Sequence, residues 1–438
     1  MKVAIAGYGI EGRASAQYWL SRGDDVVILD ENPNLTVDLE DVSFVAGVEA
    51  FSSLDSYDLV VRTASLRPDR LAGAKKVWSA TNEFFDECPA PIIGVTGTKG
   101  KGTTCSLIAS ILRAAGKTVH LVGNIGVPAL EVLPNIEQDD IVVYELSSFQ
   151  LWDLEKSPQI AVVLMIEPDH LDTHSSFEEY VSAKANIRRY QGLEGVCIYH
   201  PTNQYSRQIA MTGDWPEDDD ERVQWQQGAH RYGVETEGMV YVDSNNFCVR
   251  NHPICSVNTL QIVGQHNIEN ACAAVSAARY LTVDDEAITA GLSDFTGLPH
   301  RLKFIAEKNG VKYYDDSIAT TPGSAIAALC SFDEPKTIIL GGSDKGASYT
   351  DIIAECKKRE VQIVAVGQTG AAIYDLALEQ GVSSYRIEGL MSEVVAKAAE
   401  VSAPGSVVLL SPASASFDQY ASYAERGEQF IEAVQSLR

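Results

Sequence analysis

The chain has little positive charge for its length. Its 438 residues include 34 Lys and Arg against 60 Asp and Glu, which gives a formal net charge of −26. A surface of this sign repels nucleic acids and anionic membranes, so we expect neither as a partner. An anionic ligand must therefore be met by a local group of cations.

The sequence also lacks an apolar run of about 18 residues, the length that a membrane-spanning helix needs. The first residues, Met1–Ala6, lead into a glycine turn too early to form the apolar part of a signal peptide. We therefore expect a cytoplasmic protein. Hydrophobic residues make up 45% of the chain and charged residues 21%, as in an ordinary globular protein. The length predicts about three domains of roughly 150 residues each.

Cysteines are few and scattered, and none stands in a CxxC pair. This distribution argues against a zinc site or a disulfide framework, and it predicts buried, reduced thiols. The eight cysteines are Cys88, Cys105, Cys197, Cys248, Cys255, Cys272, Cys330 and Cys356.

The amino-terminal segment predicts a Rossmann-like domain over residues 1–88. A short apolar strand at 2–6 enters the turn Gly7–Gly12, a helix extends to about Ser21, and a second strand at 26–29 ends at Asp30. The GxGxxG pattern is typical of NAD binding, with Asp30 on a ribose hydroxyl. The same pattern also occurs in nucleotide-sugar sites and in purely structural turns, so the ligand stays open at this point.

A phosphate-binding loop opens a second predicted domain, residues 89–297. A buried-strand pattern enters the glycine-rich segment Gly94–Thr104, whose backbone N–H groups and following helix suit a phosphate, and Lys101 can reach the β- and γ-phosphates of a nucleotide. The strict Walker pattern places Ser or Thr directly after that lysine to hold Mg²⁺. Here Gly102 follows instead, so we expect Thr103, in preference to Thr104, to supply the hydroxyl.

Two further strands of this domain end in polar groups. The strand at 140–144 ends at Glu145, and the strand at 160–166 leads into Asp169 and His170. Ligands of open α/β sheets bind beyond such strand ends, so we expect one site beside the phosphate loop. Glu145 and Thr103 suit a first Mg²⁺, and His170 suits a second. The charge run at 214–222 is predicted to be a solvated loop.

Regular alternation of strands and helices predicts a third α/β domain, residues 298–438. The fold class expected for the whole chain is therefore α/β in three domains. Strands are expected at 311–315, 336–341, 362–367 and 405–411, and helices near 322–331, 349–357, 369–379, 390–400 and 417–436.

Taken together, these motifs resemble the Mur ligase family, and within it the branch that joins glutamate to UDP-N-acetylmuramoyl-L-alanine. The resemblance implies a UDP-binding Rossmann-like domain, a central P-loop ATPase-type domain and a carboxyl-terminal Rossmann-like domain that binds the amino acid. The activity implied is an ATP-dependent amide ligation through an acyl phosphate. The motifs that carry the resemblance are Gly94–Thr104, Gly123–Gly126, Glu145–Leu151, Asp169–His170, Tyr180–Lys184, Gly264–Asn267 with Asn270, Leu298–Arg301, Asp316–Ser317, Gly341–Gly342, Asp344–Lys345, Leu410–Ala413 and Arg426–Gly427.

The family also implies roles for single residues. Lys184, which residue type alone would place in solvent, matches the lysine that the family carbamylates. Thr103 and Glu145 would then hold one Mg²⁺, and His170 with carbamylated Lys184 would hold a second. The catalytic residues implied by the family are Lys101, Glu145, His170 and Lys184. Expected ATP contacts are Gly97, Thr98, Lys99, Gly100, Lys101, Gly102, Thr103, Thr104, Asn267, Asn270, Arg301 and Asp316. Expected contacts with UDP-MurNAc-L-Ala or glutamate are Gly9, Ile10, Glu11, Asp30, Asn124, Ser147, Thr320, Lys345, Ser416 and Tyr423. We expect a monomer.

Two departures from the family pattern leave the substrates open. Ile318 stands where ligases for D-glutamate often carry a lysine, so a ligase that adds L-glutamate is an alternative. The loop Arg62–Pro68 lacks the Ser-Pro-Gly turn that usually lies near the uracil or ribose. Three further hypotheses compete with the muramoyl ligase: a folylpolyglutamate synthase-like ligase, a nucleotide-binding scaffold without turnover, and a dehydrogenase that uses the amino-terminal turn.

Overall fold

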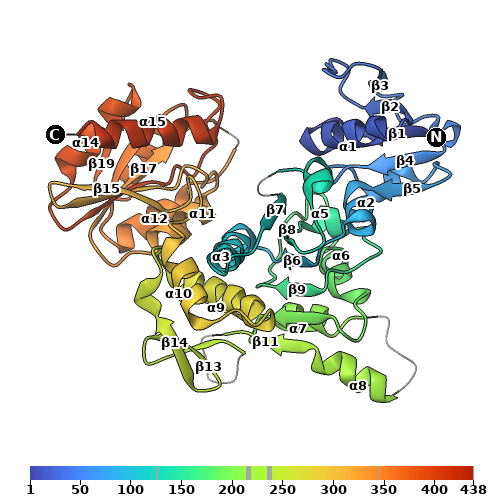
Figure 1. Ribbon diagram of the computed structural model, residues 1–438. Coiled ribbons are helices and arrows are strands. Elements are labelled where there is room, and N and C mark those ends of the chain that lie inside the picture. The colour runs from blue at the N-terminus through green and yellow to red at the C-terminus, as the bar shows by residue number, and fades with distance from the viewer. Residues whose placement is uncertain (125–126, 214–218, 234–238, 345, 438) are drawn as a thin grey trace. The chain divides into compact units, whose positions relative to one another are not determined.

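The computed structural model describes residues 1–124, 127–213, 219–233, 239–344 and 346–437 (Figure 1). The chain forms two compact units. The first contains residues 1–259 and 268–294, and the second contains residues 260–267 and 295–438. Parallel sheets dominate both units, which confirms the predicted α/β fold class. The division into domains at 1–88, 89–297 and 298–438 stays a prediction.

The first sheet is parallel, with its strands in the order β3-β2-β1-β4-β5. The central strand β1 is buried on both faces, as its continuous apolar sequence requires. Tight turns connect these strands to the helices beside them. The elements are β1 Lys2–Ala6, α1 Ile10–Ser21, β2 Asp25–Asp30, β3 Ser43–Ala46, η1 Leu54–Ser56, β4 Leu59–Arg62, η2 Pro68–Leu71, β5 Val77–Ser79 and α2 Ala80–Glu87.

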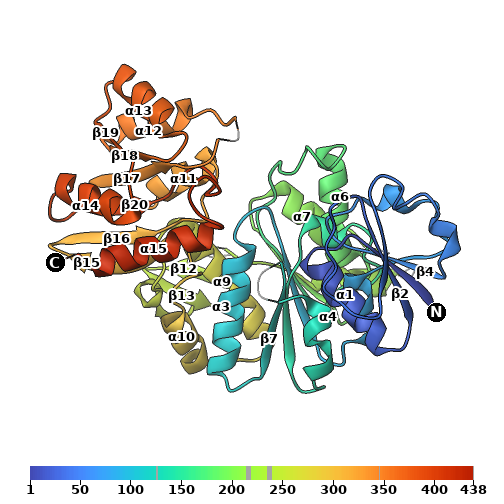
Figure 2. The same cartoon turned by 90° about the horizontal axis from the view of Figure 1, so that it is seen from above.

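The second sheet is also parallel, in the order β11-β10-β9-β6-β8-β7, and it contains the phosphate loop. Its strands and nearby helices are β6 Ile92–Thr96, α3 Lys101–Ala114, β7 Val119–Gly123, α4 Ala129–Val132, η3 Leu133–Asn135, β8 Ile141–Glu145, α5 Ser148–Leu151, β9 Ile160–Val163, α6 Phe177–Arg189, β10 Val196–Tyr199, α7 Gln204–Ala210, α8 Asp219–Gln227 and β11 Ala229–Arg231. One buried cluster joins the first two sheets, and Phe84 and Tyr144 meet edge to face within it at 5.4 Å. Helices α1 and α4 lie side by side in this region (Figure 2).

The first unit also contains a small sheet that was not predicted. Its three antiparallel strands are β12 Tyr241–Asp243, β13 Asn246–Val249 and β14 His252–Ser256, followed by η4 Val257–Thr259. Helices α9 Gln265–Tyr280 and α10 Asp285–Asp294 follow, and α10 packs closely on α3. A Cβ at Gly291 would lie 2.3 Å from the Cα of Ile111, so this contact requires glycine.

The second unit has one sheet in the order β15-β16-β20-β17-β18-β19, parallel except for β15. Helices α11, α12 and α13 cover one face, and α14 and α15 cover the other (Figure 1). The elements are β15 Lys303–Lys308, β16 Val311–Asp315, α11 Pro322–Leu329, β17 Lys336–Gly341, α12 Thr350–Lys358, β18 Gln362–Val366, α13 Gly370–Glu379, β19 Ser384–Ile387, α14 Met391–Val401, β20 Val407–Leu410 and α15 Tyr423–Gln435.

Several predicted elements need correction. The helix expected from 417 begins only at Tyr423, because Ser422 caps it by accepting a hydrogen bond from the Glu425 N–H. The strand expected over 160–166 ends at Val163. In the charge run at 214–222, residues 219–222 are helical rather than loop, and 214–218 lie outside the described residues.

The cysteines match their prediction in part. All eight are free thiols, and five are buried as expected. Cys88 and Cys255 are only partly buried, and Cys330 is exposed. Among the described residues, no helix is long and apolar enough to cross a membrane.

Candidate active site

The phosphate loop lies between the buried strand β6 and helix α3. Gly100 caps α3 with a φ of +82°, a left-handed conformation that favours glycine. A Cβ at Gly100 would lie 2.3 Å from the Asn270 Oδ1 atom, so the loop also needs glycine here for space. Asn270 therefore lies directly against the loop.

Two lysines share one backbone carbonyl beneath this loop. Lys101 Nζ donates to the carbonyl oxygen of Gly97 at 3.1 Å, and Lys184 Nζ donates to the same oxygen at 3.0 Å. Lys184 is 1% exposed, although residue type alone predicts a solvated lysine. Burial, followed by the nearby Lys101, lowers the pKa of the Lys184 ammonium well below its usual range. The surroundings of this amine thus disfavour its charged form relative to water.

The two candidate hydroxyls of α3 differ in their surroundings. Thr104 Oγ1 is 3.4 Å from Asn270 Oδ1 and fully buried. Thr103 is also buried, but among the described residues its hydroxyl has no hydrogen-bond partner. The structure thus leaves the Thr103 oxygen available for a ligand, while the Thr104 oxygen is used to hold Asn270.

The predicted metal ligands lie at the carboxyl ends of neighbouring strands. Glu145 ends β8, is buried, and accepts a hydrogen bond from Asn124 Nδ2 at 3.4 Å. His170 follows β9, is half exposed, and has a left-handed φ of +54°. Among the described residues, His, Cys, Asp and Glu side chains form no cluster of three that could hold a metal ion alone. A metal site here would need other oxygen donors.

A salt bridge connects the phosphate loop to the His170 turn. Lys99 Nζ lies 3.5 Å from Asp169 Oδ2, and the Lys99 side chain is 76% exposed. On the buried side, the Thr98 hydroxyl accepts a hydrogen bond from the Glu167 N–H at 2.9 Å. Both contacts bring the two loops together, as the sequence predicted for one site.

Carboxylates surround the amino-terminal glycine turn. Asp30 accepts from the backbone N–H of Tyr8 and of Asn32, each at 2.8 Å, and Glu11 accepts from the Ala64 N–H at 2.7 Å. Burial raises the pKa of Glu11. Gly9 and Ile10 begin α1 and are exposed. This turn therefore has exposed backbone groups beside two acceptor side chains.

The second unit holds the remaining predicted residues. Asp316 is buried, Ser411 Oγ donates to it at 2.6 Å, and burial raises the pKa of its carboxyl to about 7. Asn267 Nδ2 donates to the Val263 carbonyl at 2.7 Å. Lys345 lies outside the described residues. Of the others, Arg301 and Tyr423 are exposed, Thr320 is partly buried, and Ser416 is buried.

Comparison with known proteins decides the family. The Mur ligase middle domain matches residues 95–278, and the Mur ligase glutamate ligase domain matches residues 300–414. The UDP-N-acetylmuramoylalanine--D-glutamate ligase of Acetivibrio thermocellus is 36% identical and is aligned over 100% of this chain and 96% of its own length. The enzyme of that name from Clostridium kluyveri is 34% identical over 100% and 97%. The chain belongs to the Mur ligase family.

Solved structures show the same fold at lower identity. The UDP-N-acetylmuramate-alanine ligase of Thermotoga maritima has a TM-score of 0.61 at 19% identity and covers 100% of this Mur ligase and 99% of its own chain. The folylpolyglutamate synthase of the same organism has a TM-score of 0.58 at 15% identity, over 82% and 93%. At these identities the likeness describes the fold alone.

Sequence reasoning missed an aromatic cluster beside Lys184 in this Mur ligase. His174 is buried, and its Nε2 lies 3.0 Å from Ser148 Oγ. Its ring packs against Phe149 at 5.3 Å and Trp152 at 4.2 Å, and burial lowers its pKa. Tyr180 completes the cluster. The only available signal was the second histidine, four residues after His170.

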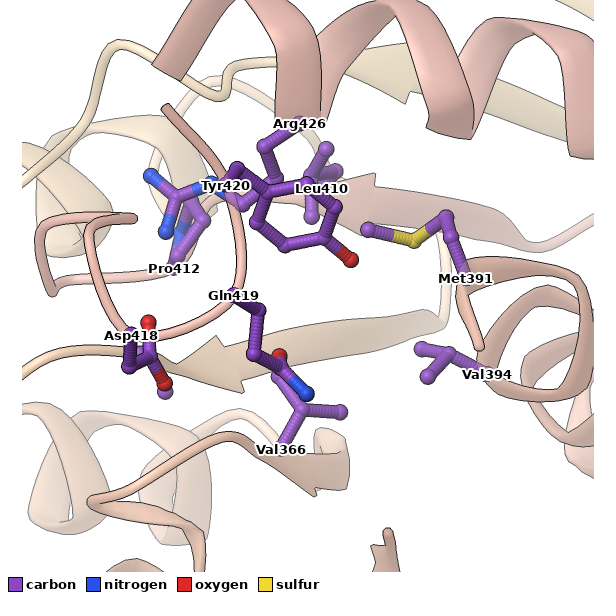
Figure 3. A pocket seen from close by; sticks show the side chains of 11 residues that line it. Val366, Met391, Val394, Leu410, Pro412, Asp418, Gln419, Tyr420 and Arg426 are labelled. Carbon is purple, nitrogen blue, oxygen red and sulfur yellow. The ribbon is translucent and has the colours of Figure 1, made fainter. Parts of the chain in front are cut away.

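A small pocket lies at the carboxyl ends of β17, β18 and β20 in the second unit (Figure 3). Its volume is about 10 Å³, which is room for roughly one water molecule. Gln419 and Tyr420 point into it, and the Tyr420 hydroxyl faces Met391. The Arg426 guanidinium beside it donates to backbone carbonyl oxygens, including those of Ser414 and Ser317. The pocket as it stands is too small for an amino acid.

Proposed function

We propose that this Mur ligase joins D-glutamate to UDP-N-acetylmuramoylalanine with ATP, a step of peptidoglycan synthesis. Relatives of that name align with the whole chain at 32–36% identity. The observation that supports the chemistry is the Gly97 carbonyl, which is contacted by both Lys101 and Lys184. Lys101 at this phosphate loop meets the need of an otherwise acidic chain for local positive charge.

The reaction starts with activation of the substrate carboxylate. A carboxylate oxygen attacks the γ-phosphorus of ATP, the new O–P bond forms, and the bond to the β-phosphate oxygen breaks to release ADP. Lys101, whose ammonium donates to loop carbonyls in this structure, turns to the phosphates and neutralises the charge that develops on the transferred group. The product of this step is an acyl phosphate.

Amide formation follows. The neutral amino group of glutamate attacks the acyl carbon, the C–N bond forms, and inorganic phosphate leaves while the nitrogen loses a proton. Holding both reactants in line supplies much of the rate, which gives the substrate contacts their role. We assign the muramoyl substrate to Asn124 and Ser147 and its UDP group to Gly9, Ile10, Glu11 and Asp30.

The residues present fit two Mg²⁺ ions. Thr103 and Glu145 offer hard oxygens that among the described residues are little used by other partners, and they would hold the first ion. His170 and carbamylated Lys184 would hold the second. Such ions neutralise charge on the phosphates. Carbamylation needs a neutral amine to attack CO₂, with loss of one proton, and the lowered pKa of Lys184 supports this.

The remaining predicted residues keep their proposed roles. We assign ATP contacts to Gly97–Thr104, Asn267, Asn270, Arg301 and Asp316, and glutamate contacts to Thr320, Lys345, Ser416 and Tyr423. Since both nucleotide substrates are made inside cells, we place the reaction in the cytoplasm, and we expect a monomer. Sedimentation equilibrium at micromolar concentration checks the monomer.

Phosphate release tests this function and the competing hypotheses. Purified protein receives Mg·ATP, UDP-N-acetylmuramoyl-L-alanine and either D- or L-glutamate, with each component omitted in turn. We expect release only when all components and D-glutamate are present. A faster rate with L-glutamate supports the alternative raised by Ile318. ATP hydrolysis that is indifferent to the muramoyl nucleotide excludes the proposed function.

A further inference from the structure

Arg67 extends from the first sheet's loop 63–68 to groups of the second sheet. Its guanidinium donates to the Thr173 carbonyl, lies 3.3 Å from Glu179 Oε1, and stacks 4.8 Å above the Trp152 ring. All four residues belong to the first compact unit. The loop that departs from the family pattern therefore makes a specific contact with a distant part of the chain.

These contacts hold the turn that carries His170. The N–H groups of Thr173 and His174 both donate to the His170 carbonyl, at 3.1 and 2.9 Å. The Arg67 guanidinium donates to the Thr173 carbonyl on the outside of that turn, and Glu179 accepts a hydrogen bond from the Ser175 N–H at 2.5 Å. The left-handed backbone of His170 costs about 1 kcal/mol, so such a turn needs outside support.

The loop that carries Arg67 is itself anchored on its other side. The Ala64 N–H donates to Glu11 at the glycine turn. Arg62, which is buried, pairs with Asp153 and donates to the Leu66 carbonyl at 2.9 Å. These anchors fix the base of Arg67, so its guanidinium can act as a rigid brace for the His170 turn.

We propose that Arg67 is a positioning residue that sets the His170 turn for the metal-dependent phosphoryl transfer. This inference rests on the role of His170 in the proposed function. Arg67 acts through the Thr173 carbonyl and Glu179, and it contacts no reacting group itself. Losing the brace allows the imidazole to leave its productive position, and a displacement of about 1 Å can cost roughly 100-fold in rate.

Alanine variants of two arginines in one loop region provide the test. Arg70, three residues away on η2, pairs with Glu31 and lies over Phe51, both in the first sheet's own segment. We expect Arg67→Ala to lower kcat about 10- to 100-fold and to raise the Mg²⁺ concentration for half-maximal rate. Arg70→Ala serves as the matched control, with both values unchanged. Arg67→Lys, which keeps a donor to Thr173, should recover part of the rate.

A binding measurement separates positioning from stability. Free Mn²⁺ is followed by electron paramagnetic resonance in the presence of ATP, and we expect several-fold weaker binding for Arg67→Ala but not for Arg70→Ala. If Arg67→Ala does not fold, Glu179→Gln weakens the brace from the other end and should shift both readouts in the same direction. Wild-type Mn²⁺ binding and Mg²⁺ dependence in folded variants overturn the proposal. Inactive wild-type protein counts instead against the proposed function.

Discussion

The two glycine turns of the first unit connect the same kinds of element, but the side chains around them are of opposite type. Each follows a buried parallel strand and leads directly into a helix, β1 into α1 and β6 into α3. Around the first turn lie the carboxylates of Glu11 and Asp30. Around the second lie Lys101 and Lys184, with the Nζ atoms of both on one carbonyl.

In the proposed function, the side chains around the turns, and not the turns themselves, distinguish the two ligands. Both turns present backbone N–H groups at a helix start, which suits any anion. Carboxylates beside the first turn are acceptors for hydroxyl groups and add no positive charge, whereas in the proposed function Lys101 beside the second neutralises phosphates. The GxGxxG pattern alone left the ligand of the first turn open, and the carboxylates beside that turn suit the ribose hydroxyls of either a dinucleotide or a nucleotide sugar.

Removal of the loop lysine should have the largest effect. Lys101→Ala takes away the cation that the mechanism brings to the transferred phosphate, and we expect about a 1000-fold lower rate of phosphate release. Lys117→Ala is the control, since this lysine is exposed in the turn between α3 and β7. Equal losses in the two variants would contradict the assignment of Lys101.

Lys184→Ala tests whether the second lysine is carbamylated. If the carbamate provides a metal ligand, we expect about 100-fold lower activity, partly restored by formate or acetate, which can enter the cavity left by the side chain. The measurement is phosphate release with and without about 100 mM formate or acetate, a concentration high enough for a weakly bound ligand. Rescue of Lys101→Ala by the same anions would show that the effect is not specific.

Alanine substitutions in the two glycine turns should show that the second turn is packed more tightly than the first. Gly100→Ala places a Cβ 2.3 Å from Asn270 at a φ of +82°, and we expect a loss of about 2–3 kcal/mol in the free energy of unfolding. Gly9→Ala has no atom within 4 Å of the added Cβ and an ordinary φ of −90°, so we expect less than about 0.5 kcal/mol. Urea denaturation of both variants provides the values, and similar losses would remove this contrast.

The sequence predicts those parts of the site that local patterns determine. Short apolar runs located β1, β6 and β8, and with them Glu145 at a strand end. The same rule failed for β15 and β19 at the edges of the last sheet. These strands are partly exposed, so their sequences lack the continuous apolar pattern.

Side chains fixed by distant packing could not be predicted from local patterns. The burial of Lys184 depends on α6 lying against the phosphate loop, 87 residues earlier, and only the family resemblance pointed to it. Arg67 and Thr173 are 106 residues apart. Neither residue type nor spacing predicts the contact between Arg67 and Thr173, because it depends on how the first two sheets pack around one core.

The smallest expected effect concerns the acidic turn. Burial raises the pKa of Glu11 above its usual 4.5, so the folded state favours the protonated form more than the unfolded state does. Stability from this group is complete below about pH 4.5 and is lost as the pH rises through the folded pKa. Glu11→Gln removes the titration but keeps an oxygen for the Ala64 N–H. The free energy of unfolding of wild type relative to this variant should therefore fall with increasing pH, and a pH-independent difference from urea denaturation would show that the Glu11 carboxylate is adequately solvated.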